Sequence, residues 1–266
     1  MKDFEILRKL KSDCLIDILR LYMKANAGHI GASLSCLDIL VFLYFNFMNK
    51  EDRFILSKGH AALALYVVLA KKGLIDEALL NTYYNNGTLL AAHPPCNHEL
   101  KGIPFGTGSL GHGLSLATGF ALSNRFTNKS NKVFCLLSEG DCDEGSTWEA
   151  ALFASQHKLK NLFVIIDNNN LQGFGKSKDV LNIEPLTDKW KSFNFDVVVA
   201  DNGNDFNSLD ASFMALNDLN SNNPKCIIAK TIKGNGISYM ENKLEWHYLP
   251  MTDDLYKQAL SEINLQ

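Results

Sequence analysis

The sequence predicts an α/β fold in which a parallel sheet is flanked by helices on both faces. From residue 133 onward, short apolar runs alternate with helical stretches, as in consecutive strand–helix–strand units. The runs are apolar at nearly every position, as expected of strands that are covered on both faces. A length of 266 residues suits one large α/β domain. Because no linker, repeat or low-complexity segment interrupts the chain, we expect a single domain over residues 1–266.

The first third of the chain is expected to be mainly helical. Apolar residues recur at helical spacing over 4–25. The two glycines of NAGHIGASLS are expected to break this helix, and a second apolar helix follows over 36–47. A strand over 53–56 then leads through a Ser-Lys-Gly-His turn into another helix. Residues 84–113 are rich in Gly, Pro, Asn and His, which predicts a long loop of the kind that is often functional.

The rest of the chain is expected to alternate between the two kinds of element. We expect strands at 133–137, 162–166, 195–199 and 225–230. We expect helices at 113–125, 145–157, 186–192 and 205–219, and a last one from about residue 252.

Composition and charge argue against several classes of protein. The formal net charge is −3 and the basic residues are scattered, so no nucleic-acid-binding arm is expected. Basic residues close to the predicted strands are expected to be solvated, although any could steer an anionic ligand: Arg53, Lys58, Lys230 and Lys233. Apolar runs such as 39–45 fall short of the ~20 residues of a membrane span. Residues 1–13 lack the continuous apolar core of a signal peptide, so we expect a cytoplasmic protein without membrane contact.

The six cysteines predict neither a zinc site nor a redox pair. None stands in C-x-x-C spacing. Most are expected to be small buried apolar residues in a reducing compartment.

Polar side chains follow two consecutive predicted strands where each strand ends. Glu139 and Asp141 come after one strand, and Asn169 after the next. Ligands of open parallel sheets bind beyond the carboxyl ends of the strands. A carboxylate, an amide oxygen and the backbone carbonyl of Leu171 would suit a Mg²⁺ ion that holds a diphosphate. The same residues are also ordinary helix caps and turn formers, so this pattern alone leaves both interpretations open.

Five ordered motifs, which together span almost the entire chain, resemble transketolases. SEGDCDEGSTWEAALFASQHKLKNL is similar to the segment of that family that carries the Gly-Asp-Gly…Asn motif for thiamine diphosphate. The other four are similar to the family's glycine-histidine loop, its Ser-x-Gly-His segment, its Thr-Gly-Ser-Leu-Gly loop and its closing histidine segment. They read NAGHIGASLS, DRFILSKGHAALALY, GTGSLGHGLSLATGFAL and AKTIKGNGISYMENKLEWH.

The resemblance implies the diphosphate-binding domain of the thiamine diphosphate-binding fold. Aligned without a gap, Ser138-Glu139-Gly140 falls on Gly-Asp-Gly, so Glu139 replaces the usual Asp; Asp141 stays open as the alternative acid. The implied ligands of Mg²⁺, or of Ca²⁺ or Mn²⁺, are Glu139, Asn169 and the carbonyl of Leu171. Gly140 would let the backbone approach the diphosphate.

Further cofactor and substrate contacts are implied by the same motifs. Gly108, Ser109 and Leu110 are expected to contact the cofactor. His60 and His247 match histidines beside the cofactor, and His29 and His93 match histidines that face the substrate. All four suit hydrogen bonding or proton transfer because the ordinary histidine pKa lies near 6.5.

Three other features are less defined by the resemblance. His112 replaces a commoner Gln, and Asn204 stands where His is usual, so the roles of both positions stay open. Glu144 and Glu149 match carboxylates near the interface between active-site units and are equally well explained as surface residues.

The resemblance implies two-carbon ketol transfer between ketose and aldose sugar phosphates. It covers only the diphosphate-binding part, so we expect a separate C-terminal subunit with the pyrimidine-binding domain, no activity without it, and a two-fold hetero-oligomer. Three alternatives stay open. These are a specialised enzyme of sugar or cell-surface saccharide biosynthesis, a 2-oxo acid dehydrogenase-type decarboxylase subunit, and an inactive cofactor-binding scaffold.

Overall fold

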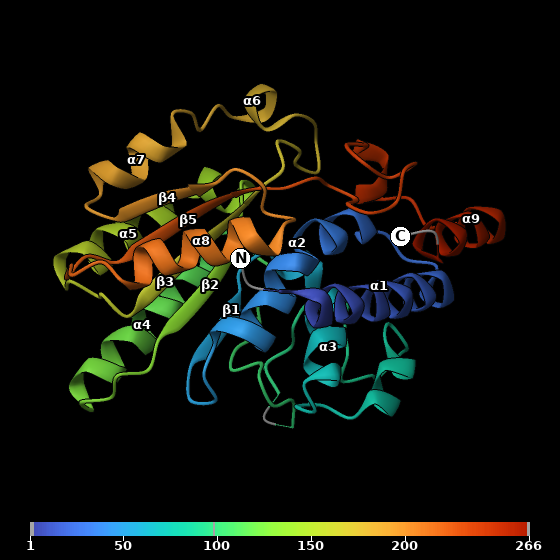
Figure 1. Ribbon diagram of the computed structural model, residues 1–266, viewed down its shortest axis with the longest axis horizontal. Helices are drawn as coiled ribbons and strands as arrows, with labels where there is room; N and C mark the ends of the chain where they lie inside the picture. The colour runs from blue at the N-terminus through green and yellow to red at the C-terminus, as the bar shows by residue number, and fades with distance from the viewer. Residues whose placement is uncertain (1–2, 98, 265–266) are drawn as a thin grey trace.

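A five-stranded parallel sheet forms the centre of the computed structural model, which describes residues 3–97 and 99–264 (Figure 1). The strand order is β1-β2-β3-β5-β4, and all neighbouring strands pair in parallel. The strands are β1 (Arg53–Leu56), β2 (Val133–Ser138), β3 (Leu162–Asn168), β4 (Asp196–Ala200) and β5 (Lys225–Lys230). The predicted fold class is confirmed, and each strand ends within two residues of its expected bounds.

Helices cover both faces of the sheet because successive strand side chains point to opposite sides. Phe134 and Leu136 of β2 belong to one apolar core, whereas Cys135 and Leu137 belong to the other. The first core packs against α1 (Glu5–Ala25), α2 (Ile30–Phe42), α3 (Ala62–Lys71), α8 (Phe206–Asn217) and α9 (Asp253–Asn264). The second packs against α4 (His112–Phe126), α5 (Gly145–Gln156) and α7 (Leu186–Ser192). In Figure 1, α9 runs beside α1, so the last helix of the chain packs against the first.

The expected start of the second helix, at residue 36, is wrong. α2 begins at Ile30, and only residues 26–29 separate it from α1, with Asn26 at φ 46° and His29 at φ 73°. Gly31 lies inside the helix because the closing segment packs directly on it. A Cβ at Gly31 would lie 3.1 Å from the backbone oxygen of Trp246. The α-helix ends at Phe42, and a π-helical turn, η1 (Leu43–Phe47), completes the stretch.

One described helical stretch, Ile30–Phe47, is long and apolar enough to cross a membrane, which the shorter apolar runs of the sequence do not indicate. In this fold 83% of that stretch is buried, as in the central helix of a core. The expectation that most cysteines are buried is confirmed, since five of the six are buried and Cys96 is exposed.

The remaining short elements connect the strands to the helices. They are η2 (Gly59–Ala61), η3 (Glu77–Thr82), η4 (Gly140–Asp143), α6 (Ser177–Val180) and η5 (Leu244–His247). Within the loop expected over 84–113, the described residues 84–97 and 99–111 are irregular, and α4 starts at His112.

Candidate active site at the carboxyl ends of the strands

A cavity of about 240 Å³ lies at the carboxyl ends of β1, β2 and β3. β2 and β3 are neighbours, and Ser138 pairs with Asp167, so the residues that follow these two strands emerge side by side. Nearly every site residue predicted from the sequence lines this cavity. These are His29, His60, His93, Gly108, Leu110, Glu139, Gly140, Asn169, Leu171 and His247. Ser109, by contrast, is exposed and does not line it.

Asp141 has no free side to offer a ligand. Its carboxylate is fully buried and accepts hydrogen bonds from Ser57 Oγ and from the N–H of Gly111, at 2.5 and 2.9 Å. It also accepts from the N–H and the hydroxyl of Ser138, at 2.7 and 2.8 Å. These four bonds fasten the end of β1 and the start of α4 to the end of β2. Of the two candidate acids, Asp141 therefore acts as a structural clamp.

Glu139 is the acid that faces the cavity. It is 3% exposed, and Oε1 accepts a bond of 3.3 Å from Asn168 Nδ2. Oε2 is buried, and no described residue makes a well-formed hydrogen bond with it. Burial raises the pKa of Glu139 to about 7, an effect that the nearby Ser177 hydroxyl and the Asn170 N–H only partly offset. A buried carboxylate oxygen without a partner is what a bound cation would neutralise.

The amide and carbonyl expected beside Glu139 are held in place. Asn169 Nδ2 donates to Ser35 Oγ at 2.9 Å, and Asn169 Oδ1 accepts from the N–H of Leu171 at 3.1 Å. In the described part of the chain, no group of three or more His, Cys, Asp or Glu side chains is arranged to hold a metal. A site with one carboxylate, one amide and one carbonyl oxygen fits Mg²⁺, which takes few protein ligands and completes its shell with phosphate and water.

The four predicted histidines converge around His29. Its ring centroid lies 5.9 Å from that of His60, 6.0 Å from His93 and 5.1 Å from His247. Burial lowers the pKa of all four imidazoles, that of His60 well below its usual value, and that of His247 falls to about 3 with Lys233 adding to the effect. At neutral pH the rings are therefore uncharged, and each has one N–H donor and one acceptor nitrogen.

The expectation that Lys58 and Lys233 are solvated is wrong, since each is 1% exposed. Lys58 forms a buried ion pair with Asp167 and donates to the carbonyl of Ala32 at 3.2 Å. Lys233 Nζ lies 3.0 Å from His247 Nδ1 and 3.4 Å from the Leu171 oxygen. Burial, with Lys58 nearby, lowers the pKa of Lys233 to about 8. Both lysines line the cavity, and both follow the end of a strand, which is the signal that could have identified them.

The expectation of solvation does hold for the other two basic residues. Arg53 is exposed, and Lys230 is exposed and pairs with Asp201 at 2.8 Å.

The positions left open by the sequence lie outside the cavity lining. Asn204 donates from Nδ2 to the Ser35 oxygen and to Asp38, at 3.0 Å each, and accepts from the N–H of Ile232. It therefore holds α2 against the segment after β5. The side chains of His112, Glu144 and Glu149 are exposed.

Two glycines let the loop that contains Gly108 pack against the Ser-Lys-Gly-His turn. A Cβ at Gly59 would lie 2.8 Å from Gly108 Cα, closer than real Cβ atoms approach. Gly108 itself has φ 153°, which residues other than glycine rarely adopt.

Comparison with known proteins identifies the family. Residues 12–265 match the family model described as "Transketolase, thiamine diphosphate binding domain". One of the subunits of the apulose-4-phosphate transketolase of Phocaeicola vulgatus is 38% identical over 256 residues, which cover 93% of this chain and 90% of that protein. The 6-deoxy-6-sulfo-D-fructose transketolase subunit SqwG of Clostridium sp. is 36% identical over 249 residues, which cover 90% of this chain and 90% of that protein.

Full-length transketolases match over a smaller share of their own length. Human transketolase is 34% identical over 252 residues, 91% of this chain and 39% of that protein. The crystal structure of the Campylobacter jejuni transketolase superimposes with a TM-score of 0.89 at 26% identity, over 99% of this chain and 43% of that one. This chain therefore belongs to the transketolase family and, like its relatives that are named as transketolase subunits, is an N-terminal transketolase chain of the thiamine diphosphate-binding type.

Proposed function

We propose that a divalent cation at the strand ends holds the diphosphate of thiamine diphosphate in this chain. Mg²⁺ is the expected ion, with Ca²⁺ or Mn²⁺ as substitutes, and its protein ligands would be Glu139, Asn169 and the Leu171 carbonyl. The observation that carries this proposal is Glu139 Oε2, which is buried beside residues 168–170 and makes no well-formed hydrogen bond with any described residue. The hydrogen bonds that saturate Asp141 support Glu139 as the metal-binding acid.

The loop that contains Gly108, Ser109 and Leu110 and the backbone at Gly140 would receive the rest of the cofactor. When bound, thiamine diphosphate supplies the nucleophilic carbon and the electron sink for two-carbon ketol transfer. The neutral His29, His60 and His93 would bind and orient the hydroxyl and carbonyl groups of the sugar and move protons during the transfer.

His247 would act through a defined nitrogen. Lys233 donates to Nδ1, so the ring proton resides on Nε2 and His247 offers an N–H donor. This Nε2 side faces Gly173, which also lines the cavity.

The proposed reaction transfers a two-carbon unit from a ketose phosphate to an aldose phosphate. A separate C-terminal transketolase subunit with the pyrimidine-binding domain would complete the site in a two-fold hetero-oligomer in the cytoplasm. The subunit names of the relatives support such a partner. Exposed apolar side chains at the cavity, Phe174 and Tyr248, support a protein partner on this face.

The test is to mix the purified chain with a candidate pyrimidine-binding chain and measure transfer from a ketose phosphate. We expect turnover only in the mixture, and only with thiamine diphosphate and Mg²⁺ present. Robust turnover by this chain alone would contradict the divided site. A mixture that associates and binds the cofactor without any turnover on a panel of ketose donors would favour the inactive scaffold.

A further inference from the structure

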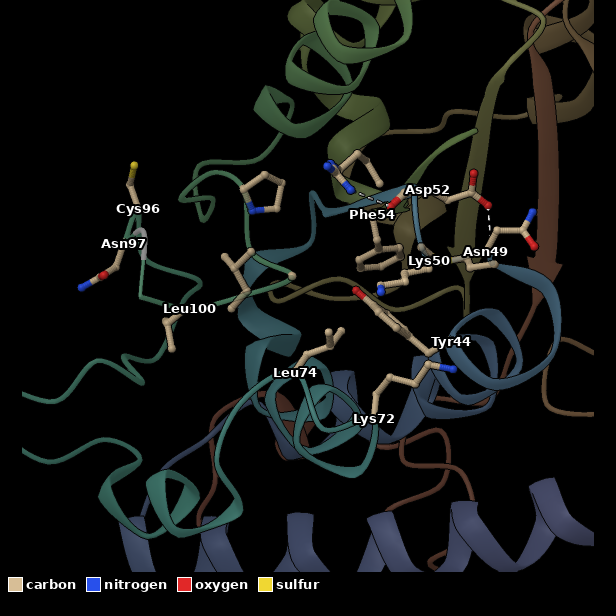
Figure 2. Close-up of a pocket in the computed structure, with 15 residues that line it drawn as sticks. Tyr44, Asn49, Lys50, Asp52, Phe54, Lys72, Leu74, Cys96, Asn97 and Leu100 are labelled. Carbon is tan, nitrogen blue, oxygen red and sulfur yellow. Dashed lines mark hydrogen bonds between the residues drawn. The ribbon is translucent and has the colours of Figure 1, made fainter. Parts of the chain in front are cut away.

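A second cavity, of about 710 Å³, lies at the opposite end of β1 from the active site. Its walls come from the end of the α2–η1 stretch, the start of β1, the end of α3 and the irregular residues 96–97 and 100–104 (Figure 2). No residue that lines it also lines the active-site cavity. Its volume falls within the range that is typical of small-molecule sites.

The interior of this cavity is mainly apolar. Phe54, Leu100 and Ile103 line the cavity, and each is no more than 5% exposed to solvent. The apolar lining residues are Tyr44, Met48, Phe54, Leu74, Leu100, Ile103 and Pro104. A lining of this kind favours a ligand with an apolar body.

One polar group inside the cavity lacks a partner. Tyr44 is 5% exposed, and no described residue bonds its hydroxyl. Burial alone raises the pKa of Tyr44, so the hydroxyl stays protonated and available as a donor. Figure 2 shows the Tyr44 side chain directed into the cavity. A buried hydroxyl without a partner is costly, and a ligand with an acceptor group here would remove that cost.

Three basic side chains, Lys50, Arg53 and Lys72, lie at the rim of the cavity. Among residues 3–97 and 99–264, no carboxylate pairs with Lys50, Arg53 or Lys72. Lys72 Nζ lies 4.8 Å from the ring centroid of Phe45, and Arg53 donates to backbone oxygens. The acid in the lining, Asp52, already accepts two backbone N–H bonds, at 2.9 and 2.7 Å.

We propose that this cavity binds a small amphiphilic anion, an apolar body that carries a carboxylate or phosphate head. The body packs against Phe54, Leu100 and Ile103. The head accepts a hydrogen bond from Tyr44 and is attracted by Lys50 and the other rim cations. Carboxylate and phosphate share the required chemistry, and the experiment separates the two.

The test is a calorimetric titration of the chain with octanoate, octyl phosphate and octan-1-ol, in buffer that contains thiamine diphosphate and Mg²⁺. We expect each chain to bind one molecule of an anionic probe. We expect octan-1-ol to bind at least about tenfold more weakly because it lacks the charge. The tighter of the two anions identifies the head group. Tyr44→Phe removes only the hydroxyl and is expected to weaken anion binding about tenfold.

A second variant and two controls make the result specific. Leu74→Trp fills the cavity from its side wall and is expected to abolish binding. The controls Tyr84→Phe and Lys257→Gln change exposed residues outside the cavity and are expected to bind like the wild type. The proposal fails if neither anion binds, if octanol binds as tightly, or if Tyr44→Phe titrates like the wild type.

Discussion

Glu139 and Asp141 are two residues apart and have different environments. The Asp141 carboxylate accepts four hydrogen bonds and stabilises the fold. Glu139 keeps one oxygen buried at the edge of the cavity, without a well-formed hydrogen bond to any described residue. Glu139 stands where the family's motif has Asp, and its burial costs stability that the proposed cation would restore.

Glu139 makes the stability of the protein without ligands depend on pH. Burial raises its folded pKa from 4.5 to about 7. The folded state holds this proton more tightly than the unfolded state. The protonated carboxyl therefore contributes fully to the free energy of unfolding below pH 4.5, and this contribution is lost as the pH rises through 7. The difference between the two pKa values corresponds to about 3 kcal/mol at most.

We therefore expect Glu139→Gln to match the wild type at about pH 5 and to be more stable by up to about 3 kcal/mol at about pH 8. Urea unfolding without metal or cofactor at both pH values measures this, and subtracting the two proteins removes the effect of other titrating groups. A stability difference that does not change with pH would contradict the assigned environment.

Lys58 and Asp167 are expected to stabilise the folded protein as an ion pair, so that loss of one partner costs more stability than loss of both. Asp167 also accepts bonds from Ser35 and Thr231, so it is held rigidly beside the hydroxyl that supports Asn169. Lys58→Met leaves that buried carboxylate without its cation and is expected to cost about 3–5 kcal/mol in urea unfolding. Lys58→Met combined with Asp167→Asn removes both charges and is expected to regain part of the loss. A double variant as unstable as the single one would show that charge pairing is not the cause.

Single residues also show where sequence reasoning falls short at the site. Ten predicted positions line the cavity because strand ends and loops carry readable motifs. Lysine is seldom buried without a partner, so the sequence alone places Lys58 and Lys233 in solvent. Their partners, Asp167 and His247, are not adjacent in sequence, so only the folded chain reveals the pairing.

At the level of elements, local patterns predict the strands better than the helix starts. Buried parallel strands are nearly continuous apolar runs, which the sequence displays directly. β3 extends two residues further, to Asn168, because Lys230 of β5 pairs with it. The start of α2 could not be predicted in this way, because Gly31 is a helix breaker locally and becomes a packing position only against Trp246.

The close contact between the Ser-Lys-Gly-His turn and the loop that contains Gly108, which we propose to hold the cofactor, yields a prediction at this level. Gly59→Ala places a Cβ 2.8 Å from Gly108 Cα, so one backbone must shift. We expect thiamine diphosphate binding to weaken measurably in a fluorescence titration. Gly119→Ala is the matched control, because its Cβ meets nothing within 4 Å and lies in α4. It should keep the affinity and raise stability by about 0.5–1 kcal/mol. Equal affinity in both variants would refute the role of this contact.

At the scale of the whole molecule, three exposed apolar residues form a rim beside the active-site cavity: Phe174, Tyr248 and Leu249. Phe174 is 85% exposed, and Tyr248 and Leu249 are about half exposed. Exposed apolar groups gathered at one site indicate a surface that another protein covers. The proposed C-terminal subunit would bury this rim and close the cavity.

Phe174→Ser is therefore expected to weaken association with the partner chain at least about tenfold, since truncation of a central aromatic anchor typically costs that much. Sedimentation of the mixed chains measures the change. Phe126→Ser is the control, because Phe126 is 77% exposed but lies at the end of α4, away from the cavity. An equal loss in both variants would argue against the rim as the interface.

The most direct measurement is a calorimetric titration of thiamine diphosphate into the chain, alone and with its partner, in Mg²⁺ and in EDTA. The account predicts tight binding only with Mg²⁺, a marked loss in Glu139→Gln, and no loss in Glu51→Gln, whose side chain is exposed before β1 and outside the cavity lining. Binding of the wild type in EDTA as tight as in Mg²⁺, or wild-type affinity in Glu139→Gln, would contradict it.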